Sequence, residues 1–86
     1  MRYRAAVAAM VAEHGMDRLY WSNGMAIEGE ELLRAARETE DQLGDCDVLF
    51  DSRYIYCAGV RGKQPGVYRR DADGNAEGEP IVEVLR

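Results

Sequence analysis

Carboxylates are concentrated in one short stretch of the chain, "ETEDQLGDCD" at residues 38–47, in which five of the ten residues are Asp or Glu. Another carboxylate, Asp51, follows four residues later. Side chains of this kind can bind a metal ion, exchange protons, or pair with the basic groups of a partner. The candidate site residues are Glu38, Glu40, Asp41, Asp45, Asp47 and Asp51.

The first two of these chemistries find little support in the spacing of the residues. Calcium needs roughly six to eight oxygen ligands around one loop. Only "DADGN" at 71–75 begins like such a loop, and Ala76 and Val82 replace its required glycine and final acid. Asp73-Gly74 is better interpreted as a hairpin turn. With one His and two Cys, a tetrahedral metal site is not expected either, so we predict no metal or other cofactor.

Tyrosines and arginines form a second candidate site within residues 52–70. Tyr54 and Tyr56 alternate onto one face of a predicted strand, and Tyr68 is expected to join them from the next strand. Exposed aromatic side chains beside basic residues can stack the bases of single-stranded nucleic acid. Alternatively, these tyrosines pack beneath the helices. The flanking basic residues are Arg53, Arg61, Lys63, Arg69 and Arg70.

No residue type and spacing indicates catalysis. His14 is the only histidine and lies at the end of an apolar helical stripe, which favours a capping or half-buried role. Ser22 and Ser52 lack the glycines of a nucleophile elbow, and no phosphate-binding glycine loop is present. Cys57 lies in an apolar run and is interpreted as a core residue, while Asp45 and Asp47 should make Cys46 a poor nucleophile. We therefore do not expect an enzyme.

The net charge of −5 is distributed in blocks. Residues 28–51 carry nine acidic and two basic side chains, whereas residues 52–70 carry five basic side chains and no acid. Such blocks produce local fields that select partners of the opposite charge. Glu38, Glu40 and Asp41 also fall in the last turns of a predicted helix, where the macrodipole disfavours negative charge. Departures from a local rule of this kind are typical of functional positions.

The elements that position these residues follow from periodicity and turn signals. Tyr3, Val7, Met10, Val11 and His14 predict a first helix, ended by Gly15. In "RLYWSNGMAIEG", Asn23-Gly24 predicts a two-residue hairpin, with a plain loop as the alternative. A second helix is expected at 30–43, with an ion pair between Glu30 and Arg34. Its buried stripe would be Leu32, Ala35, Ala36, Thr39 and Leu43, and strands are expected at 47–51, 53–60, 66–70 and 80–85.

These elements predict an α+β fold in which two helices pack on one face of a small antiparallel sheet, in the approximate order α-β-α-β-β-β-β. At 86 residues the chain is expected to form a single compact domain over residues 1–86. No apolar run reaches the roughly 18 residues of a membrane span, and Glu13 and His14 interrupt the N-terminal apolar stretch early. We therefore expect a cytoplasmic protein without a membrane partner.

In size, acidity and the absence of catalytic motifs, the chain resembles small phage-encoded inhibitors, above all anti-CRISPR proteins. The resemblance implies a non-enzymatic protein that occupies the nucleic-acid channel or the nuclease recruitment surface of a CRISPR effector. A spaced array of carboxylates can imitate the phosphates of a duplex. The sequence therefore predicts that the acidic residues bind a basic surface of a nucleic-acid-handling partner.

Two alternatives remain. The first is a protein interaction or oligomerisation module, such as an antitoxin or an assembly subunit, with contacts at Tyr20, Trp21, Tyr54 and Tyr56. The second is a single-strand binder that uses Tyr54, Tyr56, Tyr68 and Arg70. The acidic net charge disfavours direct nucleic-acid binding.

Overall fold

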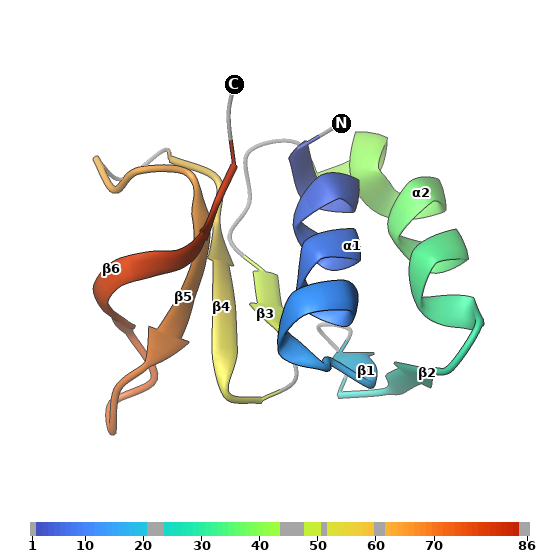
Figure 1. Cartoon of the computed structure of the whole chain (residues 1–86), viewed down its shortest axis with the longest axis horizontal. Helices are drawn as coiled ribbons and strands as arrows, with labels where there is room; N and C mark the ends of the chain where they lie inside the picture. The colour runs from blue at the N-terminus through green and yellow to red at the C-terminus, as the bar shows by residue number, and fades with distance from the viewer. Residues whose placement is uncertain (1, 21–23, 44–47, 51, 60–61, 85–86) are drawn as a thin grey trace.

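The computed structural model describes residues 2–20, 24–43, 48–50, 52–59 and 62–84. Two helices and six strands follow one another in an α+β arrangement, as predicted, although the hairpin after the first helix contributes two strands (Figure 1). The elements are α1 (Arg2–His14), β1 (Arg18–Tyr20), β2 (Ala26–Glu28), α2 (Glu31–Leu43), β3 (Val48–Phe50), β4 (Tyr54–Cys57), β5 (Gly66–Arg70) and β6 (Ala76–Glu83).

Helix α1 forms as its periodicity predicts. Tyr3, Val7 and Met10 are buried along one face, and His14 is half-buried in the last turn. Gly15 then takes a φ of 64°, a left-handed conformation that suits glycine, and the Met16 amide donates a 3.1 Å hydrogen bond to the Met10 carbonyl. The helix therefore ends where the sequence indicates.

The hairpin is present, but its predicted two-residue turn is wrong. Tyr20 pairs with Ala26, so five residues separate the two strands. The same register pairs Leu19, which is fully buried, with Ile27. A two-residue turn at Asn23-Gly24 would place Leu19 opposite Glu28 instead. The buried Leu19 is therefore paired with an apolar residue, and the register does not follow the turn signal.

Helix α2 buries Leu32, Ala35 and Ala36, as predicted, and Thr39 is half-buried. The predicted Glu30–Arg34 ion pair is wrong, because Arg34 pairs with Glu31 one turn away. Residues three apart on a helix are also neighbours, and Glu31 already lies in the first helical turn. Among the described residues, no helix is long and apolar enough to cross a membrane.

The second sheet is an antiparallel meander in the order β3-β4-β5-β6. Strand β6 starts at Ala76, earlier than the predicted start at residue 80. Val67 of β5 pairs with Val82, and Arg69 pairs with Glu77. Strand β6 therefore has extra residues between these two pairs and bulges there. Gly78, with a φ of 67°, lies in this bulge. Because the bulge separates two paired stretches, periodicity alone identifies only the second one.

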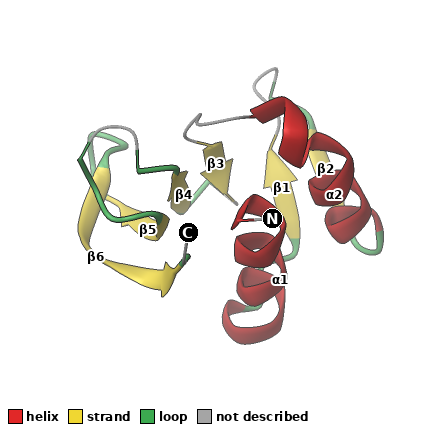
Figure 2. Cartoon of the chain, turned by 90° about the horizontal axis from the view of Figure 1, so that it is seen from above, coloured by secondary structure: helices red, strands yellow, loops and turns green. Residues whose placement is uncertain are grey.

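The two helices pack against each other and differ in the strands that they contact. Helix α1 lies against the four-stranded sheet, while α2 packs mainly against α1 and β2 (Figures 1 and 2). Tyr3 joins the layers: its ring makes edge contacts with Phe50 at 5.7 Å and Tyr56 at 5.5 Å between centroids. Burial raises the pKa of its hydroxyl, and the side chain of Thr39 on α2 partly offsets this effect. Helix α1 therefore contacts both the four-stranded sheet and α2, as expected for the predicted α+β fold.

Candidate functional site

The last turns of α2 carry Glu38, Glu40 and Asp41, which we call the acidic helix end. The two helices run in opposite directions, so this end lies beside the start of α1 (Figure 1). The described first turn of α1 contains no acidic residue, and the last turn of α2 contains no basic residue. Each helix end therefore lacks a charge of the favourable sign on its own chain segment, and α2 supplies a carboxylate to the start of α1.

Glu40 is a residue of α2, but its side chain interacts with the start of α1. Its Oε1 accepts a 3.4 Å hydrogen bond from the Arg4 backbone amide, one of the amides that a helix leaves without an intrahelical partner. Burial alone would raise the pKa of Glu40, but hydrogen bonds, including the one from Arg4, and the charge of Arg4 lower it overall. A carboxylate at the unfavourable end of α2 is thus at the favourable end of α1. Glu40 therefore has a structural role.

Glu38 and Asp41 differ from Glu40, because both are exposed. Neither takes part in an ion pair within the part of the chain that the structure describes. Glu38 contributes to the raised pKa of Arg34, but the hydrogen bond and charge of Glu31 contribute more. These two carboxylates oppose the macrodipole of α2 without the compensation that Glu40 has.

The other predicted acids, Asp45, Asp47 and Asp51, lie outside the described residues. In the sequence, Asp45 and Asp47 come four and six residues after Asp41. Of the predicted acidic site, the structure therefore places only Glu38, Glu40 and Asp41. Glu40 differs from the other two because it accepts the hydrogen bond from the Arg4 amide.

The predicted tyrosine platform is wrong for Tyr54 and Tyr56. They do share a face of β4, but only 8% and 3% of their surfaces are exposed. The Tyr56 ring is stacked with Phe50 at 6.0 Å and meets Tyr3 of α1 edge-on. The Arg53 guanidinium lies 5.1 Å from the centroid of the Tyr54 ring. Both tyrosines therefore pack in the core, and neither offers a free ring for a base.

Tyr68 lies on the opposite face of the sheet. It pairs with Ile55, whereas Tyr56 pairs with Val67, and directly opposed residues share a face. Its ring is also buried, with the Lys63 ammonium 5.4 Å from the ring centroid. Its hydroxyl donates a 2.6 Å hydrogen bond to the Gln64 carbonyl. Burial raises the pKa of Tyr68.

Arg70, the last residue of the second candidate site, connects two turns. Its Nε donates to the Gly74 carbonyl at 3.2 Å, and one terminal nitrogen donates to the Ser52 carbonyl at 2.8 Å. Asp71 and Gly74 form the predicted hairpin turn, in which the Gly74 amide donates to the Asp71 carbonyl at 3.0 Å. Arg70 thus connects the turn before β4 to the turn after β5. The sequence does not indicate this role, because the acceptors are backbone carbonyls and involve no particular side chain.

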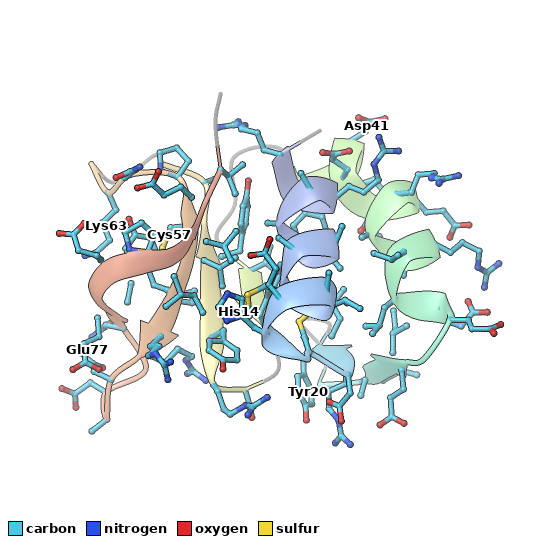
Figure 3. All side chains as sticks on the ribbon, in the orientation of Figure 1. His14, Tyr20, Asp41, Cys57, Lys63 and Glu77 are labelled. Atoms are coloured by element: carbon cyan, nitrogen blue, oxygen red, sulfur yellow. The ribbon has the colours of Figure 1, made fainter. Side chains whose placement is uncertain are left out.

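Other reactive groups are dispersed. Within the described ranges, no three His, Cys, Asp or Glu side chains come together in a way that could hold a metal ion. Cys57 is buried, as predicted, and Figure 3 shows it in the sheet, away from Asp41. Cys46 and Trp21 lie outside the described residues, and Tyr20, also named for an aromatic interface, is half-buried.

Comparisons with protein-family models, with curated proteins and with solved structures give no match for this chain. The functional conclusion therefore depends on the residues and their geometry.

Proposed function

We propose that the protein is a non-enzymatic inhibitor that binds a basic surface of a nucleic-acid-handling partner through its acidic helix end. Glu38 and Asp41 make the contact, continued by Asp45 and Asp47, and the carboxylates stand in for the phosphates of nucleic acid. A CRISPR effector with a basic channel is a partner of the kind that the resemblance to anti-CRISPR proteins implies. The interaction takes place in the cytoplasm.

The exposure of Glu38 and Asp41 carries this proposal. Both lie at a helix end where negative charge is unfavourable, and neither forms an ion pair with a described residue. Glu40, on the same turns, shows what a structural carboxylate at this place does, since it accepts the Arg4 amide. A partner with lysines and arginines supplies the compensation that Glu38 and Asp41 lack within the protein.

This mechanism makes association dependent on ionic strength. Exposed charges attract a basic surface over about one Debye length, roughly 8–10 Å at physiological salt, and added salt screens them. The attraction mainly accelerates encounter and selects the partner, while the contacts that form afterwards determine the lifetime. Binding should therefore weaken as salt increases.

The alternative of an aromatic interaction surface is weakened by burial. Tyr54 and Tyr56 were two of its four proposed contacts, and both are core residues. The acidic helix end keeps its two most exposed members, Glu38 and Asp41, available.

The test is capture of proteins from a host lysate with the protein tagged at its C-terminus, which leaves the start of α1 beside Glu40 unmodified. We compare the wild type with the double variant Glu38→Lys/Asp41→Lys. The matched control is Glu79→Lys/Glu83→Lys, which makes the same change in charge at exposed positions of β6. All three proteins should show the same circular dichroism spectrum.

The proposal predicts that the wild type and the control retain a nucleic-acid-binding protein that added duplex DNA releases, and that the acidic-end variant does not. The proposed mimicry would be excluded if all three proteins retained the partner equally. It would also be excluded if added duplex DNA did not release the retained partner.

A further inference from the structure

A pocket of about 590 Å³ lies at the hairpin end of the sheet, between the turn at residues 52–53 and the turn at 71–74. It is separate from the acidic helix end: in Figure 3, Glu77 at this pocket and Asp41 lie on opposite sides of the molecule. Three arginines line it, Arg53, Arg69 and Arg70. A volume of this size lies within the range of small-molecule sites.

The guanidinium of Arg70 is fixed in place before any ligand binds. Two carbonyls, those of Gly74 and Ser52, accept hydrogen bonds from it. No carboxylate of a described residue lies within ion-pair distance of Arg70. Carbonyl acceptors orient the group, and its positive charge has no counter-ion among the described residues. A preorganised cation of this kind is suited to an anionic ligand.

The nearest acid along the chain, Asp71, does not form an ion pair with Arg70. The Asp71 Oδ1 accepts two backbone hydrogen bonds of 2.9 Å, from the amides of Asp73 and Asn75, and thereby closes the turn. Its carboxylate is therefore committed to the backbone of its own turn, as in an Asx turn.

Arg69 provides a second cation that has no counter-ion in the part of the chain that the structure describes. It is exposed and lines the same pocket. Its cross-strand partner is Glu77, yet the two side chains do not form an ion pair in the described structure. Glu77 and Asp73 remain at the pocket as competing carboxylates.

We propose that this pocket binds a phosphoryl group through Arg69 and Arg70. A phosphoryl group carries several acceptor oxygens, so it can accept hydrogen bonds from two guanidinium groups at once. Base stacking does not contribute, because Tyr54 is buried and Arg53 lies over its ring. The phosphoryl group can come from free phosphate or from a nucleic-acid backbone, and binding is independent of the acidic helix end.

The experiment is a nuclear magnetic resonance titration of the labelled protein at pH 7.5 with sodium phosphate, beside sodium chloride at the same ionic strength. The signals followed are the backbone amide of Gly74 and the Nε–H groups of Arg69 and Arg70. Phosphate should shift them in a saturable way, and chloride should not. Saturation separates a site from general screening.

Two variants with the same loss of charge locate the site. Arg69→Gln should weaken phosphate binding about tenfold, the effect of one charge-assisted hydrogen bond. Arg37→Gln is the control, because Arg37 is another exposed arginine and lies on α2. Glu77→Gln removes a competing carboxylate and should tighten binding. Thermal melting of each variant checks that its fold is intact.

A thymidine oligonucleotide and free thymidine distinguish the sources. If the oligonucleotide shifts the arginine signals at lower concentration than phosphate, the natural ligand is a nucleic-acid backbone. If phosphate alone shifts them, it is a small phosphorylated compound. The proposal is overturned if neither causes saturable shifts, if thymidine causes the same shifts, or if Arg37→Gln weakens binding as much as Arg69→Gln.

Discussion

The acidic helix end and the arginine-lined hairpin end each contain one charged residue with a structural role and one that is exposed. At each end one charged residue holds the fold together: Glu40 accepts the Arg4 amide, and Arg70 donates to the Ser52 and Gly74 carbonyls. At each end a neighbour with the same charge, Asp41 or Arg69, is exposed and forms no ion pair with a described residue. A run of like charges in the sequence is therefore a mixture of structural and available groups.

Arg70→Ala should produce the largest loss of stability at either end. It removes two hydrogen bonds from a charged donor to carbonyls, so we expect it to lower the free energy of unfolding by about 2 kcal/mol. Arg69→Ala, a change of the same type at the adjacent exposed residue, should remain within about 0.5 kcal/mol of the wild type. Urea unfolding measures both. Equal losses would contradict the division between structural and available arginines.

Glu40→Ala should have the next largest effect. Loss of a capping carboxylate typically lowers stability by about 1 kcal/mol. Glu38→Ala and Asp41→Ala should be neutral or slightly stabilising, because each removes a negative charge from the C-terminal end of α2. The same unfolding experiment separates them, and a loss at Asp41 as large as the loss at Glu40 would show that Asp41 also has a structural role.

The contribution of the Glu40 charge should depend on pH. Because the pKa of Glu40 is lowered in the folded protein, its charge stabilises the fold above the ordinary glutamate pKa of about 4.3, and this contribution disappears as pH falls through the lowered value. The stability difference between wild type and Glu40→Gln should thus be constant near neutral pH and vanish in acid. Unfolding curves at pH 7 and at pH 2.5 measure it. A difference that persists in acid would assign the effect to packing.

Ser52→Gly should have the smallest effect and the opposite sign. Ser52 has a φ of 53°, a conformation that a residue with a Cβ adopts only at some cost, and its carbonyl accepts the bond from Arg70. Glycine should increase stability by about 0.5 kcal/mol if Arg70 holds the turn in this shape. A decrease in thermal stability would show that the side chain of Ser52 supports the turn.

The sequence predicts the parts of the fold that depend on local pattern. The buried stripe of Leu32, Ala35 and Ala36, the glycine that ends α1, and the Asp71–Gly74 turn all follow from spacing over a few residues. These features depend on periodicity and turn chemistry, which neighbouring residues determine.

The parts that the sequence does not predict depend on contacts between distant segments. Glu40 contacts Arg4, 36 positions away, so its place at the end of α2 looks unfavourable until α1 is positioned beside it. The one feature of the sequence that agrees with this contact is the absence of an acidic residue in the described first turn of α1. The alternation of Tyr54 and Tyr56 is compatible with an exposed face or a buried face of the strand. The position of α1 determines that the face is buried.

The most direct test of the account measures stability and partner retention on the same two variants. Glu38→Gln/Asp41→Gln removes the available carboxylates, and Glu40→Ala removes the structural one. The account predicts that the first variant loses the retained nucleic-acid-binding protein and keeps its stability, while the second loses about 1 kcal/mol of stability and keeps the partner. If Glu40→Ala loses the partner at a temperature where it remains folded, or if Glu38→Gln/Asp41→Gln retains it, the assignment of the binding site to Glu38 and Asp41 is contradicted.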